Sequence, residues 1–162
     1  MPLPNPRQTN LIIFIGCVAL ILIALGFQEI MGLAPCPLCI TQRIFVVAVG
    51  LFALAGFIHN PGNTGRKAYA VGGLLMAIAG AGFSGRHLYL QGLPPDQLPS
   101  CGPGLGYMFE TFPFMEALEI LLMGDGNCGE IMWSLFGLSM PGWVLVAFIG
   151  LALFNIWQFL RR

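Results

Sequence analysis

The sequence predicts an all-α membrane protein, a bundle of four transmembrane helices with a short first and a long second loop on the outer side. Hydrophobic residues make up 57% of the 162 residues and charged residues only 9%, against about 45–50% and about 25% in soluble domains. In addition, four apolar stretches are long enough to cross a hydrocarbon core of about 30 Å, which needs roughly 20 helical residues. Because no long polar linker divides the chain, we expect a single integral membrane domain over residues 1–162.

The four predicted spans follow one another at about residues 11–31, 40–59, 67–91 and 142–160. The tight turn "GLAPCP" connects the first two, and Pro61 with Gly62 and Gly65 interrupts helical structure between the second and the third. Small residues recur along the third span at four-residue intervals: Gly73, Ala77, Ala81 and Gly85. A stripe of this kind lets neighbouring backbones approach closely, which favours a compact bundle.

The charged residues indicate how the bundle is oriented, since Lys and Arg accumulate in short cytoplasmic loops. In a four-span arrangement one side collects most of the basic residues: Arg7, Arg66, Lys67, Arg161 and Arg162. All seven acidic residues fall on the opposite side. We therefore expect both termini and the loop at about residues 60–66 in the cytoplasm, with the loops at about 32–39 and 92–141 outside. The apolar run at residues 11–27 exceeds the roughly 7–15 residues of a signal-peptide core, so the first span is expected to be a membrane helix.

Four of the five cysteines fall on the outer side of this arrangement: Cys36, Cys39, Cys101 and Cys128. Cys17 lies among apolar residues in the first span and is expected to behave as an inert small hydrophobe. Disulfides are chemically permitted outside the cytoplasm, and four cysteines allow three pairings among which the spacing does not choose. Static disulfides are one alternative to a redox role. A zinc site is disfavoured because the chain has only one C-x-x-C pair.

The stretch "APCPLCITQR" carries the strongest indication of redox chemistry. The spacing of Cys36 and Cys39 is typical of exchange-active thiol pairs, and Pro37 restricts the backbone between them. If a helix begins near Pro37, Cys39 lies in its first turn, where unpaired N–H groups and the helix dipole favour a thiolate. Arg43 follows Cys39 by four residues and shares its helix face. We interpret Arg43 as a cation beside this thiolate; its alternative role is to reach the interface or a lipid phosphate.

A thiol pair that releases electrons needs an acceptor, and the chain contains no Rossmann glycine fingerprint, haem-attachment motif or P-loop. The acceptor is therefore expected to be another protein or a lipid-soluble molecule, and a quinone fits a site with aromatic walls and hydrogen-bond donors. The segment "SGRHLYLQG" supplies His87 near the outer end of the third span. An imidazole N–H can donate to a quinone carbonyl oxygen. Without the cysteines, a histidine here would more simply face water or a headgroup.

The long outer loop combines a pliable segment with an amphipathic one. Prolines and glycines exclude a regular helix or central strand over "LPPDQLPSCGPGLG", so Cys101 is expected to be accessible to a large partner. Residues 112–123 place apolar side chains on one face and Glu116 and Glu119 on the other. This pattern predicts a short helix in the interface that keeps Cys128 near the membrane surface.

Taken together, the motifs "PCPLCITQR", "RHLYLQ", "SCGPGL", "GDGNC" and "WSLFGLSMPGW" closely resemble, in order and over nearly the whole chain, the DsbB family of disulfide bond formation proteins. These are bacterial inner-membrane enzymes that reoxidise the periplasmic thiol oxidase DsbA. The related vitamin K epoxide reductase-like family places its C-x-x-C after the loop cysteines, whereas here it comes before them.

The resemblance implies a relay of two disulfides, one between Cys36 and Cys39 and one between Cys101 and Cys128. A DsbA-like thiolate would attack Cys101, Cys128 would be released toward Cys36, and Cys39 would become the thiolate that engages ubiquinone, or menaquinone under anaerobic conditions. Arg43 and His87 would bind the quinone, and neither a metal nor a nucleic acid is implied. The outer loops would then be periplasmic. The residue before Arg43 is Gln42, so an acidic side chain that could assist at that position is missing. The resemblance implies no role for Arg86. The alternative function is a non-catalytic membrane scaffold stapled by disulfides.

Overall fold

The computed structural model describes residues 5–32, 35–98, 113, 115–116, 126–129 and 131–161. The long helices in this part of the chain are α1 (Pro6–Met31), α2 (Pro37–His59), α3 (Asn63–Gln91) and α6 (Met140–Leu160). The described residues between α3 and α6 include two 3-10 helices, η1 (Pro95–Gln97) and η2 (Gly126–Gly129), and two strands, β1 (Ser134–Leu135) and β2 (Leu138–Ser139). All four long helices are long and apolar enough to cross a membrane. The predicted all-α membrane fold with four spans is thereby confirmed. Cys101 and most of the predicted interfacial helix at residues 112–123 lie outside the described residues.

Each long helix begins a few residues before its predicted apolar stretch, and side-chain caps contribute to this at α1 and α2. At the start of α1, Asn5 Oδ1 accepts from the Arg7 N–H and Gln8 Oε1 accepts from the Asn5 N–H, which forms a capping box. Pro37 is the first residue of α2, and Pro141 lies in the first turn of α6. Proline suits these positions because a first-turn N–H has no partner within the helix. The prolines therefore mark where helices begin.

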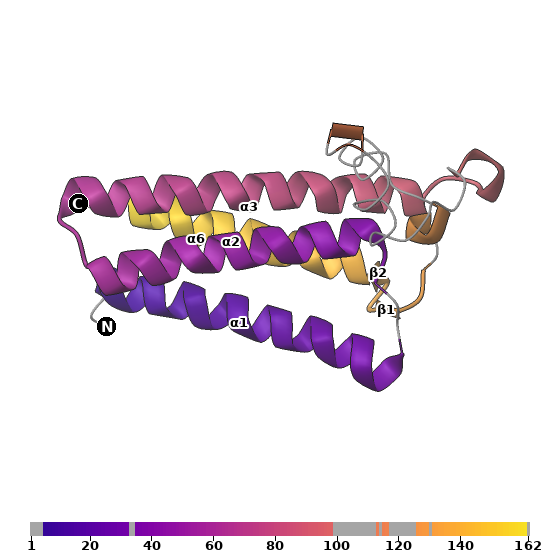
Figure 1. Cartoon of the computed structure of the whole chain (residues 1–162), viewed down its shortest axis with the longest axis horizontal. Helices are drawn as coiled ribbons and strands as arrows, with labels where there is room; N and C mark the ends of the chain where they lie inside the picture. Colours follow the sequence, from indigo (N-terminus) through magenta and orange to yellow (C-terminus); the bar gives the residue numbers. More distant parts are fainter. Residues whose placement is uncertain are drawn as a thin grey trace.

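α3 is the central helix of the bundle. It packs along both α2 and α6, whereas α1 packs mainly against α2 (Figure 1). The main core cluster draws on all four long helices: Ile13, Cys17, Val46, Val49, Ala53, Ala77, Phe148 and Leu151. Large apolar side chains also cover the outside of the bundle, where Leu22 and Leu153 are 63% and 60% exposed. Such a surface suits lipid, which is as apolar as these side chains.

The packed face of α3 differs from the predicted stripe of small residues. Seven residues form its buried face: Ala70, Gly73, Ala77, Gly80, Ser84, His87 and Leu90. Ala81 and Gly85 are only half-buried, and a Cβ added to Gly85 would meet nothing within 4 Å. Ala81 still packs against the main core cluster, so the four-residue interval fails only at Gly85, because a face that follows 3.6 residues per turn alternates steps of four and three.

The two ends of the bundle differ in what they hold. The chain termini and the α2–α3 turn lie at one end, while the start of α2 and the strands β1 and β2 lie at the other (Figure 1). At the first end, Arg66 Nη2 donates to the Arg161 carbonyl at 2.6 Å, which connects α3 to the end of α6. In the nearby core, Gln158 Nε2 donates to Asn10 Oδ1 and joins α6 to α1. The segments that connect successive long helices thus alternate between the two ends, as a four-span bundle requires.

Candidate active site

The C-x-x-C pair lies at the N-terminus of α2, where the backbone orients both thiols. Cys36 is the N-cap residue, and its Sγ accepts from the Cys39 N–H at 3.4 Å. The two Sγ atoms are 3.2 Å apart. Thr41 Oγ1 donates to the Pro37 carbonyl at 3.1 Å and secures the first turn. Cys39 therefore lies in that first turn, where the free N–H groups and the helix dipole favour a thiolate.

His87 of α3 faces this thiol pair from the neighbouring helix. The side chain is only 3% exposed, so it faces the bundle interior and not water or a headgroup. Its Nε2 lies 3.8 Å from Cys36 Sγ, and its Nδ1 lies 3.9 Å from Cys39 Sγ. Gln42, itself 3% exposed, places its Nε2 at 3.3 Å from Nδ1. An amide N–H donated to Nδ1 requires the ring proton to be on Nε2, the nitrogen that faces Cys36.

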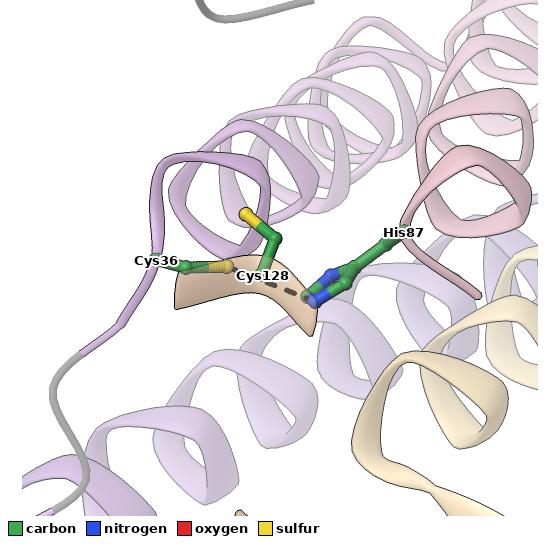
Figure 2. A group of neighbouring side chains, drawn as sticks. All are labelled: Cys36, His87 and Cys128. Carbon is green, nitrogen blue, oxygen red and sulfur yellow. Dashed lines mark hydrogen bonds between the residues drawn. The ribbon is translucent and has the colours of Figure 1, made fainter. Parts of the chain in front are cut away.

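Cys128 approaches the same point from the segment between α3 and α6. It lies in η2, its side chain is fully buried, and it packs with Leu38 and Leu90 in a small core cluster. Its Sγ, the Cys36 Sγ and a ring nitrogen of His87 all lie within 4.8 Å of one another. Figure 2 shows the three side chains converging from η2, α2 and α3. Three residues that are distant in sequence thus share one site.

Arg43 lies one turn after Cys39 and reaches toward α1. Its Nη1 donates to Gln28 Oε1 at 2.7 Å, and its Nη2 donates to the Ala24 carbonyl at 3.1 Å. These two bonds hold the guanidinium close to the C-terminal end of α1. Gln28 was not identified from the sequence, since nothing in "GFQEIM" shows that it faces another helix.

An apolar cavity of about 120 Å³ extends from the thiols between α1, α2 and α6. Most of its walls are aliphatic or aromatic, and the rings of Phe27 and Trp133 lie 4.9 Å apart at their centroids. Its polar lining includes seven side chains: Gln28, Cys36, Cys39, Gln42, Arg43, His87 and Gln91. An apolar cavity with a few convergent polar groups is typical of a small-molecule site.

Gln91 connects the cavity wall to the segment that precedes α6. Its Oε1 accepts from Ser139 Oγ at 2.6 Å. The β1–β2 hairpin beside it is held by Trp143, whose Nε1 donates to the Leu135 carbonyl at 3.2 Å. Sequence reasoning did not identify Gln91, because its partner lies 48 positions away in the chain. This contact secures one wall of the cavity.

Of the six predicted site residues, the structure brings five together: Cys36, Cys39, Arg43, His87 and Cys128. The sixth, Cys101, is outside the described residues. Neighbouring thiols can exchange disulfides, since a thiolate attacks one sulfur of a disulfide and releases the other. The arrangement can therefore pass a disulfide between Cys128 and the C-x-x-C pair beside an apolar cavity.

Comparison with known proteins points to the same chemistry. Residues 6–158 match the family described as "Disulfide bond formation protein DsbB". "Disulfide bond formation protein B" of Saccharophagus degradans is 57% identical over 160 residues, which cover 99% of this chain and 96% of the relative. The protein of the same name from Methylococcus capsulatus is 50% identical and covers 98% and 96%. "Disulfide bond formation protein B 1" of Pseudomonas aeruginosa is 46% identical and covers 100% and 99%.

Proposed function

The chain belongs to the DsbB family of disulfide bond formation proteins, and on this basis we propose that it is a protein-thiol:quinone oxidoreductase. It would reoxidise a periplasmic DsbA-type thiol oxidase and pass two electrons to a membrane quinone. Family membership makes the chain a membrane protein that functions in disulfide bond formation. The observation that carries the finer proposal is the cluster of Cys36, Cys39 and Cys128 around His87, at the mouth of an apolar cavity.

The cavity residues fit a quinone. An apolar lining accommodates the ring, and the ring pair of Phe27 and Trp133 supplies an aromatic wall. Arg43 and His87 would hold the carbonyl oxygens of ubiquinone, or of menaquinone under anaerobic conditions, by donating N–H groups. A bound quinone supplies the two-electron acceptor. The bonds from Arg43 to Gln28 and Ala24 pre-orient the guanidinium, so little freedom is lost on binding.

The thiol steps begin with two disulfides, Cys36 with Cys39 and Cys101 with Cys128. A thiolate of the reduced partner attacks Cys101, which forms a mixed disulfide and releases Cys128 as a thiolate. Cys128 attacks Cys36, so that a bond between these two sulfurs forms and Cys39 is released as a thiolate. The burial of Cys128 beside Cys36 supports this second exchange. The partner's second thiolate then attacks the mixed disulfide, which closes the partner's disulfide and releases Cys101. Cys101 attacks Cys128 and frees Cys36, and Cys36 and Cys39 form their disulfide again as two electrons pass to the acceptor, which takes up two protons.

The orientation belongs to the same proposal. We place the protein in the bacterial inner membrane as a single multi-pass domain over residues 1–162, with both termini cytoplasmic. The loops at about residues 32–39 and 92–141 would be periplasmic and the loop at about 60–66 cytoplasmic. Two observations support it: the termini share one end of the bundle with the α2–α3 turn, and the thiol cluster lies at the N-terminus of α2, at the other end (Figure 1).

The test is anaerobic mixing of the purified protein with a reduced DsbA-type partner and a short-chain ubiquinone. We expect stoichiometric loss of quinone absorbance for the wild type and for Cys17→Ser, whose thiol is buried in the core away from the site. Cys39→Ser should abolish the loss, while Cys101 still forms a mixed disulfide with the partner. A folded wild type that consumes neither ubiquinone nor menaquinone would contradict the oxidoreductase and leave a disulfide-stapled scaffold.

A further inference from the structure

We propose that the reduced protein binds one thiophilic divalent cation, such as Zn²⁺, between Cys36, His87 and Cys128. The sequence disfavours a zinc site because it holds a single C-x-x-C pair, but it does not show which distant residues the fold adds to that pair. In the structure α3 contributes an imidazole and η2 a third thiol, so three elements supply the donors (Figure 2). Thiolate sulfur and imidazole nitrogen are the donors that Zn²⁺ prefers.

The distances between the donor atoms suit one tetrahedral ion. With Zn–S bonds of about 2.3 Å and Zn–N bonds of about 2.0 Å, tetrahedral ligand atoms lie roughly 3.5–3.8 Å apart. Cys36 Sγ and His87 Nε2 are 3.8 Å apart, and the three donor atoms all lie within 4.8 Å of one another. A shift of about 1 Å or less in each separation would therefore complete the site.

A fourth donor and an orienting partner are also present. Cys39 Sγ lies 3.2 Å from Cys36 Sγ and can close the coordination shell. Gln42 faces the Nδ1 of His87 at 3.3 Å, and its amide can rotate to accept an Nδ1–H proton when Nε2 binds the ion. A hydrogen bond to the non-ligating nitrogen is the usual support for a metal-bound histidine.

Binding of the ion requires reduced cysteines, because a sulfur that is part of a disulfide cannot bind the ion as a thiolate. Cys36 and Cys39 carry free thiols in the structure. The ion displaces the protons of the Cys36 and Cys128 thiols and no electron is transferred, so binding weakens as the pH falls. The consequence for turnover rests on the proposed function: an ion held by Cys36 and Cys128 blocks the exchange between them.

The binding experiment uses the full-length protein in detergent, reduced with a phosphine and titrated with Zn²⁺ alone in a calorimeter. We expect one ion per chain. Cys36→Ser, His87→Ala and Cys128→Ser should each weaken binding at least about tenfold, or roughly 1.4 kcal/mol. Cys17→Ser and Cys101→Ser are the matched controls, since each removes a thiol outside the three-ligand set, and both should keep wild-type affinity. Helicity measured by circular dichroism shows which variants have folded.

Co²⁺ gives a second measurement that needs no variant. In the wild type we expect the intense visible bands of a tetrahedral ion and a thiolate-to-metal charge-transfer band, both removed by prior oxidation of the thiols. An octahedral spectrum without charge transfer, or Zn²⁺ affinity unchanged in folded Cys36→Ser and Cys128→Ser, would overturn the site. Partner and quinone are absent from both measurements, so their result does not depend on the oxidoreductase assay.

Discussion

At the scale of single residues, Arg43 has two roles, one in the cavity and one in the contact between α2 and α1. It shares a helix face and the cavity with Cys39, and it donates two hydrogen bonds to the last turns of α1. A charge-assisted hydrogen bond contributes about 1.5–3 kcal/mol, so part of any Arg43 effect is structural. A substitution that keeps the charge but not the planar fork distinguishes the two roles.

We predict that Arg43→Gln raises the KM for a short-chain ubiquinone by about tenfold, the effect of losing roughly 1.4 kcal/mol of binding. Arg43→Lys should lie between this variant and the wild type, because the ammonium keeps the charge. Turnover with a DsbA-type partner, measured over a range of quinone concentrations, checks both. Arg86→Gln is the control, since Arg86 is exposed and lies over the Tyr89 ring, 5.6 Å from its centroid. An equal rise in KM for the control would argue against quinone binding by Arg43.

Gln42 is the closer of two groups that face His87 Nδ1, and its loss leaves this buried nitrogen with only the Cys39 sulfur at 3.9 Å, a weak hydrogen-bond partner. An unsatisfied buried polar atom costs about 1–3 kcal/mol. We therefore predict that Gln42→Leu lowers the free energy of unfolding by about 1–3 kcal/mol, measured by denaturant titration in detergent. Gln97→Leu, at an exposed position in η1, should change it by less than about 0.5 kcal/mol. Equal stability of Gln42→Leu and the wild type would mean that the contact contributes nothing.

At the scale of elements, the close contact of α3 with α6 depends on a glycine, Gly80, which has no side chain. A Cβ at Gly80 would collide with the Phe148 ring, whereas a Cβ at Gly82 would meet nothing within 4 Å. Phe148 itself is fully buried in the main core cluster. The two glycines thus differ in what they face, although both occupy the same helix.

We predict that Gly80→Ala lowers the free energy of unfolding by about 1–3 kcal/mol, the usual cost of overpacking. Gly82→Ala should cause no loss. Phe148→Leu combined with Gly80→Ala should recover part of the stability, since a smaller side chain makes room for the new methyl group. A double-mutant cycle by denaturant titration measures this coupling. Additive effects of the two substitutions would show that Gly80 does not face Phe148.

Sequence patterns predicted the elements well and their contacts poorly, for a physical reason. Hydropathy reports burial in lipid, so it located four spans, and helix geometry correctly placed Arg43 one turn after Cys39. The bonds of Gln42 to His87 and of Gln91 to Ser139 join residues 45 and 48 positions apart. Such pairs form only when helices pack against each other, and the hydrophobic periodicity of a single helix does not reveal them. The roles of the site residues stay predictions.

At the scale of the whole molecule, the bundle places an arginine contact at one end and the thiol cluster at the other. Arg66 contacts Arg161 at the end that holds the termini, and the thiol cluster lies at the other end. If the basic end faces the cytoplasm, every thiol of the relay meets the periplasm, where disulfides persist. The proposed electron path would then run from the periplasmic surface into the cavity.

This orientation predicts opposite labelling of two exposed positions, Thr64 at the start of α3 and Asp96 in η1. In a background with the native cysteines replaced by serine, Asp96→Cys should react with a membrane-impermeant maleimide in cells whose outer membrane alone is permeable. Thr64→Cys should react only after the inner membrane is opened, because its thiol would face the cytoplasm. Detergent-solubilised protein, in which both thiols should react, controls for burial. The reverse pattern would turn the bundle over and leave Cys36, Cys39 and Cys128 facing a reducing compartment, where a disulfide relay has no stable product.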